Sequence, residues 1–333
     1  MARNRTLRGR TCRRTGGRHC SALRVRVLVS FPGEALARWA DALARLLPEA
    51  EVRAWSADAP PFDADYVAAF RPPAELFARE QRVRAVFNLA AGAEAMLSVP
   101  TLDPSIPIYR LEDAGMAGQM ADYASYAVLR WYRDMDRYAE QAARREWKQL
   151  KPRRKIDFTV GVLGLGEMGG AVARRIASLG FPVRGWSRAP RQIDRVAPFA
   201  GRDGLLPFLA DSRVVIAALP LTEETRGILD RSAFAQMPAG SFVVNVGRGG
   251  LVIEQDLLNA LDSGHIGGAM LDVFATEPLP PDHPFWRHPR VTVTPHVSAV
   301  TLRDVSLAQV AEKIRRCHRG ETVTGRVDRA RGY

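Results

Sequence analysis

The sequence predicts an α/β protein made of two doubly wound parallel sheets, with a cleft between the two domains. Short β-branched runs alternate with amphipathic, helix-length segments along most of the chain, as expected where helices connect parallel strands. The length of 333 residues is sufficient for two domains with separate hydrophobic cores. A glycine-rich turn near the middle of the chain, placed between a strand-like run and a helix-like run, marks the start of the second sheet.

The first domain is predicted from a series of short strand-like runs without a glycine triplet. Its strands are expected at residues 23–29, 52–55, 66–70, 83–88 and 108–111, and its helices at 36–47 and 74–81. After the fourth strand, the small residues 89–94 form a turn that opens a helix. The exposed backbone N–H groups of such a turn can hold a carboxylate, although most Ala-Gly turns only connect two elements.

Residues 114–149 are predicted to form one long helix that is dense in aromatic residues. They include Tyr123, Tyr126, Trp131, Tyr132 and Tyr138. Two interpretations stay open, an extended contact with another subunit or packing within the core of the same chain. A basic connector, residues 148–155, leads from this helix into the second sheet.

The second sheet is predicted to begin at a nucleotide-binding fingerprint. A β-branched run over residues 158–163 is followed by the pattern G-x-G-x-x-G at Gly164, Gly166 and Gly169, then by a helix and a strand at 182–186. The first glycine permits the tight turn, the second lets the backbone approach a pyrophosphate, and the third lets helix and strand pack closely. The helix N-terminus also favours phosphate charge. This context favours dinucleotide binding over a chance glycine-rich turn.

The end of the strand at 182–186 predicts which dinucleotide is bound. An NAD site usually has Asp or Glu here to bind the ribose 2′-hydroxyl, whereas this chain has Ser187 and Arg188, with Arg191 nearby and no acid before Asp194. A guanidinium and a hydroxyl can bind a 2′-phosphate, which a carboxylate would repel. For Arg191, an ordinary surface position is an equally good interpretation. The pattern predicts NADPH as the preferred cofactor, with NADH possible.

Further strands are expected at residues 214–219, 242–246, 269–273 and 291–294. Because ligands bind at the carboxyl ends of parallel strands, the polar residues that follow are candidates for the chemistry. Arg248 offers a planar fork for the oxygens of a 2-keto acid. His296 is the candidate proton donor, and Glu277 is placed to hold its other ring nitrogen. Each residue alone also fits a structural role, but together they favour hydride transfer to a carbonyl.

The last helix, expected at residues 302–319, is predicted to return to the first domain and to make that domain discontinuous. The expected limits are residues 1–23 for a basic extension, 24–112 plus 303–333 for a substrate-binding domain, and 113–302 for a dinucleotide-binding domain.

The composition is that of an ordinary soluble globular protein without an apolar run long enough to span a membrane. Of the net charge of +12, seven positive charges come from arginines in residues 1–23, which contain no acid. This segment lacks the apolar core of a secretory signal and is expected to be a disordered extension, with a targeting segment or a nucleic-acid arm as alternatives. Cys12, Cys20 and Cys317 are too few and too scattered for a disulfide framework or a metal site, which favours a cytoplasmic setting and predicts no metal.

Several motifs make the chain resemble the D-2-hydroxyacid dehydrogenase family, and within it the glyoxylate/hydroxypyruvate reductase A group. They are YRLEDAGM at residues 109–116, GWSR at 185–188, AMLDVF at 269–274, EPLPP at 277–281 and VDRARGY at 327–333. The resemblance covers residues 24–333 almost continuously. It implies two Rossmann-like domains and NADPH-dependent reduction of glyoxylate to glycolate and of hydroxypyruvate to D-glycerate.

The resemblance also implies roles for individual residues. It implies Arg248, Glu277 and His296 as the catalytic trio, substrate-carboxylate binding by the N–H groups of Gly92 and Ala93, and a homodimer contact through the long aromatic helix. It places Asp272 near the nicotinamide amide. The expected cofactor contacts are Gly164, Leu165, Gly166, Glu167, Met168, Gly169, Ser187, Arg188, Arg191, Leu219, Pro220, Thr225, Val246, Gly247 and Asp272.

Two other functions are compatible with parts of the sequence. One is the reduction of a bulkier 2-keto acid such as phenylpyruvate, which pocket size would decide, with Trp55 as a candidate pocket wall. The other is a non-enzymatic, nicotinamide-sensing corepressor whose basic tail contacts nucleic acid. The complete set of Arg, Glu and His argues against the corepressor. We therefore expect a small 2-keto acid as ligand, with no nucleic-acid partner and no membrane association.

Overall fold

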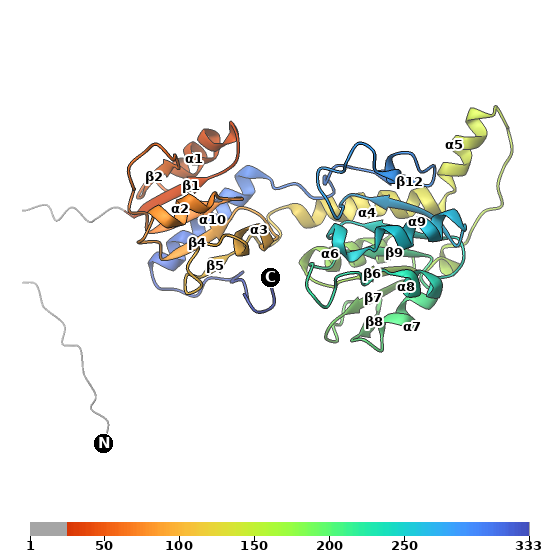
Figure 1. The fold of residues 1–333 in the computed structure, drawn as a ribbon. Coiled ribbons are helices and arrows are strands. Elements are labelled where there is room, and N and C mark those ends of the chain that lie inside the picture. Colours follow the sequence, from red (N-terminus) through yellow and green to blue (C-terminus); the bar gives the residue numbers. More distant parts are fainter. Residues whose placement is uncertain (1–24, 333) are drawn as a thin grey trace, which may run out of the picture.

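The computed structural model describes residues 25–332, so the basic extension expected at residues 1–23 lies outside the described residues. The described chain forms two parallel sheets with helices packed on their faces (Figure 1). The strand order is β2-β1-β3-β4-β5 in the first sheet and β12-β11-β10-β9-β6-β7-β8 in the second. The predicted α/β class with two doubly wound parallel sheets is confirmed.

The central strands of the first sheet are buried on both faces and are largely apolar, whereas the edge strand β2 is partly exposed. Its strands are β1 (Arg26–Ser30), β2 (Glu51–Ala54), β3 (Tyr66–Ala69), β4 (Ala85–Asn88) and β5 (Ile108–Tyr109). Its helices are α1 (Ala35–Leu46), α2 (Ala74–Arg79), α3 (Glu94–Leu97) and α10 (Arg303–His318). Val27 and Val29 belong to the core beneath α1 and α10, whereas Leu28 belongs to the core beneath α2 and α3. This alternation follows from the two-residue period of a strand.

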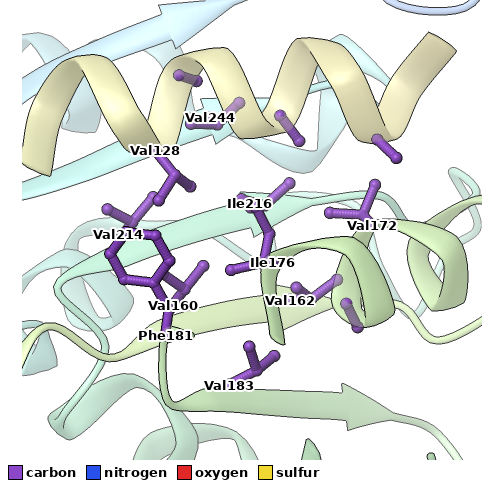
Figure 2. Packing of buried hydrophobic residues seen from close by; sticks show 14 of the residues in the cluster. Val128, Val160, Val162, Val172, Ile176, Phe181, Val183, Val214, Ile216 and Val244 are labelled. Carbon is purple, nitrogen blue, oxygen red and sulfur yellow. The ribbon is translucent and has the colours of Figure 1, made fainter. Parts of the chain in front are cut away.

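The second sheet is built in the same way but has seven strands. These are β6 (Val160–Leu163), β7 (Val183–Ser187), β8 (Val196–Ala200), β9 (Val214–Ala217), β10 (Ser241–Asn245), β11 (Ile266–Leu271) and β12 (Val291–Val293). The helices are α4 (Met116–Tyr132), α5 (Met135–Ala143), α6 (Glu167–Ser178), α7 (Leu205–Ala210), α8 (Arg231–Gln236) and α9 (Glu254–Asp262). Figure 2 shows the apolar layer between the sheet and the helices α4 and α6, with Val128, Ile176 and Ile216 among its members. The core on the opposite face takes side chains from α7, α8 and α9.

The domains are connected by helix α4 and by the segment that leads into α10. The first residue of α4, Met116, lies in the core of the first domain, and Val128 of the same helix lies in the core of the second. Helix α10 returns to the first sheet, where Leu307 and Ile314 join the core beneath α1 (Figure 1). Beyond α10, the chain runs antiparallel to β5, with the Arg110 N–H donating to the Gly325 carbonyl at 2.9 Å. The chain thus begins and ends its described part on the same sheet.

The prediction of one long helix over residues 114–149 is wrong, because the helix is broken between α4 and α5. Asp134 adopts φ +53° at the break. Arg153, from the connector, donates to the Trp131 carbonyl at 2.9 Å and to Asp134 Oδ1 at 2.6 Å. A side chain distant in sequence therefore satisfies the end of α4 and allows the chain to turn. The helix α5 ends at Ala143, and residues 147–154 are extended or irregular.

The aromatic residues of this segment divide between two environments. Tyr123, Trp131 and Tyr132 pack against the core of the second sheet, and the Trp131 ring stacks on Phe242 with centroids 4.6 Å apart. Tyr126 and Trp147 are exposed, and so is the apolar side chain of Met135. The interpretation as internal core packing thus holds for part of the segment, and the exposed side chains leave an apolar surface on α4, α5 and the connector.

Strand β8 was not expected from the sequence. It pairs with β7 only and forms the edge of the second sheet. Pro198 lies within it, and proline is tolerated in strands mainly at an edge. Within the described residues, no helix is both long and apolar enough to cross a membrane.

Candidate active site

The glycine-rich turn has the geometry that the fingerprint predicts. Gly164 adopts φ +99°, and a Cβ atom there would lie 2.8 Å from the Ala218 carbonyl oxygen. A Cβ atom on Gly169 would lie 1.8 Å from the Gly164 carbonyl oxygen, so only glycine lets α6 approach β6 this closely. Gly166, at the N-cap of α6, has no atom within 4 Å of the position a Cβ would take.

These features fit a pyrophosphate. The first N–H groups of a helix have no partner inside the helix, and α6 extends over 12 residues behind them. The open position at Gly166 lets a ligand approach this part of the backbone. Glu167 and Met168 follow in the first turn, and Met168 packs against the cores of both domains. The glycine turn therefore lies where the two domains meet.

The residues predicted to select the cofactor lie at the end of β7. Ser187 donates its hydroxyl to the Ala189 carbonyl at 2.7 Å. Arg188 Nη1 lies 3.4 Å from Glu224 Oε2, and both side chains are at least half exposed. Arg191 is exposed in the following loop. Glu224 is a neighbour that the sequence analysis did not identify, because it comes from a loop 36 residues further along the chain.

The loops after β9 and β10 lie against each other. A Cβ atom on Gly247 would be 2.8 Å from the Leu219 carbonyl oxygen. Thr225 donates its hydroxyl to the Pro220 carbonyl at 2.7 Å and so closes the loop after β9. Val246 is buried directly after β10. The structure thus brings the predicted cofactor residues of these two strands to one edge of the sheet.

Asp272 is fully buried after β11 and organises the loop that follows β12. Its Oδ1 accepts hydrogen bonds from the Thr294 hydroxyl at 2.6 Å and the Val297 N–H at 2.8 Å, and its Oδ2 accepts from the Ser298 N–H at 2.8 Å. The Thr294 hydroxyl also lies 2.7 Å from the Tyr123 hydroxyl, and burial raises the pKa of Tyr123 to about 12. This carboxylate therefore holds the residues on both sides of His296.

His296 is fixed by its backbone and by one ring nitrogen. It adopts φ +56°, and its N–H donates to the Asp272 carbonyl at 2.8 Å. Nδ1 lies 2.8 Å from Glu277 Oε2, while Glu277 Oε1 accepts from the Phe274 N–H at 3.0 Å. Because a carboxylate only accepts, Nδ1 carries the proton in this pair. The imidazole is 45% exposed, and Nε2 makes no hydrogen bond to another described residue, so this nitrogen is accessible to a ligand.

Arg248 follows β10 and reaches the first domain. Its Nε and Nη2 donate to the two carboxylate oxygens of Glu94 at 3.0 Å and 3.3 Å, and its Nη1 donates to the Gly247 carbonyl at 2.8 Å. A Cβ atom on Gly92 would lie 1.9 Å from Arg248 Nη2. The predicted guanidinium and the predicted carboxylate-binding turn are therefore in direct contact.

The turn around Gly92 is shaped by Asn88, which the sequence analysis did not single out. Its Nδ2 donates to the Ala90 carbonyl at 2.9 Å and to the Gly92 carbonyl at 2.7 Å. Among the described residues, the Gly92 and Ala93 N–H groups have no acceptor. An Asn at the end of a buried strand, directly before a small-residue turn, was the available signal.

The catalytic candidates lie on loops that follow three neighbouring strands, β10, β11 and β12. A Cβ atom on Gly249 would lie 1.8 Å from the Phe274 carbonyl carbon, so the loop that carries Arg248 packs on the loop that carries Glu277. The Glu277 loop in turn binds His296. The arrangement offers a guanidinium, an imidazole with one accessible nitrogen, and free backbone N–H groups beside a nucleotide-binding turn.

Comparison with known proteins shows which family the chain resembles. Residues 126–298 match the family model described as D-isomer specific 2-hydroxyacid dehydrogenase, NAD binding domain. The chain is 45% identical over 302 residues to a glyoxylate/hydroxypyruvate reductase A of Serratia proteamaculans (strain 568), covering 89% of this chain and 96% of that protein.

Two solved structures have the same fold. One is a D-isomer specific 2-hydroxyacid dehydrogenase of Xanthobacter autotrophicus Py2 in complex with NADPH and MES, with 39% identity, a TM-score of 0.87, and coverage of 92% of this chain and 99% of that chain. The other is an NADPH-dependent glyoxylate/hydroxypyruvate reductase of Sinorhizobium meliloti in complex with NADP and sulfate, with 34% identity, a TM-score of 0.86 and the same coverage.

Proposed function

Because the chain belongs to the D-isomer specific 2-hydroxyacid dehydrogenase family, we propose that it reduces small 2-keto acids with NADPH, converting glyoxylate to glycolate and hydroxypyruvate to D-glycerate. One observation carries the proposal. The loops after β10, β11 and β12 bring Arg248 and the His296–Glu277 pair to one edge of a sheet that begins with a nucleotide-binding turn. The two solved structures named above, which contain NADPH and NADP, support NADPH as the preferred cofactor.

The cofactor would be held by the glycine turn and by the ends of the neighbouring strands. The α6 N-terminus and the open backbone at Gly166 suit the pyrophosphate. Ser187 and Arg188 suit the 2′-phosphate, and NADH, which lacks this group, would bind more weakly. The residues after β9 and β10, together with Asp272, would surround the nicotinamide end of the cofactor. When bound, the reduced nicotinamide supplies a hydride.

The keto acid would be held from both domains. In our proposal the Gly92 and Ala93 N–H groups bind its carboxylate, and Arg248 binds its carboxylate and carbonyl oxygens. The accessible Nε2 of His296 gives a proton to the oxygen at C2 as that oxygen gains negative charge. Glu277 holds Nδ1–H, orients the ring and stabilises its protonated form. In this scheme residues 24–112 and 303–333 bind the substrate, and residues 113–302 bind the nucleotide.

The proposed function is tested by following NADPH absorbance with a panel of 2-keto acids. We expect the highest kcat/KM with glyoxylate and hydroxypyruvate, and a lower value when NADH replaces NADPH. The panel includes phenylpyruvate, which would be the best substrate if the pocket served bulkier keto acids. Failure to oxidise NADPH with every member of the panel would exclude the proposed reaction.

We also propose that the enzyme is a cytoplasmic homodimer. Tyr126, Met135 and Trp147 leave apolar surface on α4, α5 and the connector, and α5 projects from the body of its domain (Figure 1). Burying such a surface against a second copy would remove it from water. Analytical ultracentrifugation should give twice the mass of the chain, and Trp147→Ser should shift the equilibrium toward the monomer. A wild-type protein that stays monomeric at micromolar concentration would contradict the dimer.

A further inference from the structure

Glu94 makes a contact with the site that the proposed function leaves unexplained. It is the first residue of α3 in the first domain, and its carboxylate takes both Nε and Nη2 of Arg248 in the second domain. The side chains of Arg248 and Glu94 are 32% and 41% exposed, so the ion pair is partly accessible to water. The contact spans 154 residues of sequence and joins the loop after β10 to the turn after β4.

The contact occupies some of the N–H donors of Arg248 and leaves others for a ligand. Arginine has five N–H donors in a rigid plane. Glu94 takes two of them and the Gly247 carbonyl takes a third. Within the described part of the chain, the remaining donors on Nη1 and Nη2 have no acceptor. An arginine held along one edge in this way presents its other donors in a fixed direction, without losing rotational freedom when a ligand binds.

We infer that Glu94 is a positioning residue that orients Arg248 toward the keto acid through a contact between the two domains. The inference rests on the proposed function. Glu94 contributes a negative charge next to the region where the substrate carboxylate would bind, which by itself weakens that binding. The bidentate contact outweighs this repulsion in our proposal, because an unheld guanidinium would have to be ordered by the substrate alone.

The test is a double-mutant cycle of Glu94→Gln, Arg248→Lys and the double variant, measured with two readouts. The first is kcat and KM for glyoxylate. The second is calorimetric binding of oxalate, a planar analogue of the 2-keto acid, to the enzyme saturated with NADP⁺. Lysine keeps the charge but has no fork for Glu94 to hold. We expect Glu94→Gln to weaken oxalate binding and lower kcat/KM by about tenfold, and to have little further effect in the Arg248→Lys background.

Each outcome decides the role of Glu94. Additive effects of the two substitutions would show that Glu94 does not act through Arg248, and tighter oxalate binding by Glu94→Gln would show that it competes with the substrate. Glu49→Gln is the matched control, since it breaks a 2.7 Å contact with Arg315 in the same domain and should change neither readout. If the wild type reduces no keto acid, the proposed function fails, while the oxalate cycle still decides whether Glu94 orients Arg248. If the wild type reduces glyoxylate but does not bind oxalate, the proposed function stands, and the kcat/KM cycle alone decides whether Glu94 acts through Arg248.

Discussion

At the scale of single residues, His296 keeps one ring nitrogen, Nε2, accessible while its Nδ1 and its backbone N–H are held. Asp272 holds the backbone on both sides of it, and Glu277 holds Nδ1. Because the backbone around His296 and one nitrogen of its ring are both held, we expect Nε2 to keep its direction through the reaction. Asp272 would thus serve the mechanism from a buried position without contacting the substrate.

Replacing His296 with alanine removes the proposed proton donor without touching the glycine turn. We expect kcat for glyoxylate to fall by roughly 10²–10⁴-fold, the usual contribution of general acid catalysis, with NADPH affinity unchanged. Stopped-flow turnover and fluorescence titration of NADPH measure the two quantities separately. His265→Ala, which changes a histidine bound to the Phe234 carbonyl, serves as a control for the substitution itself. Unchanged turnover in His296→Ala would remove this residue from the mechanism.

Arg188 is predicted to bind the 2′-phosphate of NADPH. Arg188→Ala should lower kcat/KM for NADPH by about ten- to a hundredfold and leave the value for NADH nearly unchanged, because a charge-assisted hydrogen bond is lost with one cofactor only. Arg195→Ala is the control, since Arg195 lies in the same region and pairs with its neighbour Asp194. Equal losses with both cofactors, or no loss with either, would contradict this reading of the strand end.

The candidate residues that the sequence identified all follow strands, because strand ends can be located from local patterns of apolar residues. Glu94 and Glu224 could not be identified in this way. Each acts on an arginine that is 154 or 36 residues away, and only the packing of separate loops brings the partners together. Local sequence therefore located the candidate arginines and the His296–Glu277 pair at strand ends, but not the acidic side chains that other loops bring to Arg188 and Arg248.

At the scale of elements, the glycine turn contains one glycine that packing requires, Gly169, and one that we propose for cofactor binding, Gly166. Gly169→Ala would force a Cβ into the Gly164 carbonyl, whereas Gly166→Ala meets only open space. We expect Gly169→Ala to destabilise the protein by roughly 1–3 kcal/mol, as overpacking does, and Gly166→Ala to keep the wild-type melting temperature but lose NADPH affinity. Thermal unfolding and NADPH titration of both variants test this. Normal NADPH binding by Gly166→Ala would contradict the proposed position of the pyrophosphate.

The elements that the sequence mispredicted have causes beyond local pattern. Strand β8 contains Pro198 and lies at a sheet edge, where a weak strand is tolerated because it pairs on one side only. The break between α4 and α5 has no glycine or proline to signal it. It depends on Arg153, which binds the end of α4 from 19 residues beyond Asp134. Tertiary contacts thus determine strand β8 and the break between α4 and α5, which local sequence patterns did not predict.

At the scale of the whole molecule, the last described segment of the chain packs against the first sheet, beside β5. Lys313 of α10 is buried, and burial lowers its pKa. Its ammonium donates to the Arg110 carbonyl at 2.7 Å, to Glu112 Oε2 at 3.0 Å and to the Thr324 carbonyl at 3.0 Å. All three ammonium hydrogens are therefore used to join β5, α10 and the segment beyond α10. The contacts of Lys313 therefore hold the C-terminal segment on the same sheet that carries the Gly92 turn.

The contacts of Glu112 with Lys313 and Thr324 predict how the stability of the protein depends on pH. Burial by itself raises the pKa of Glu112, but hydrogen bonds from Thr324 and Lys313 outweigh it, so that the pKa is lowered from 4.5. The unfolded chain then binds a proton at higher pH than the folded chain, and the stabilisation from Glu112 is complete above pH 4.5 and lost as the pH falls below it.

We therefore expect Glu112→Gln to lower the melting temperature at neutral pH, and the gap to the wild type to close as the pH is reduced below 4.5. Differential scanning calorimetry across this range measures the gap. Glu75→Gln is the matched control, because Glu75 is an exposed residue of α2 for which the described structure shows no ion pair. A gap that widens in acid would mean that the Glu112 carboxylate is destabilising, and the segment beyond α10 would then be held by Lys313 and backbone pairing alone.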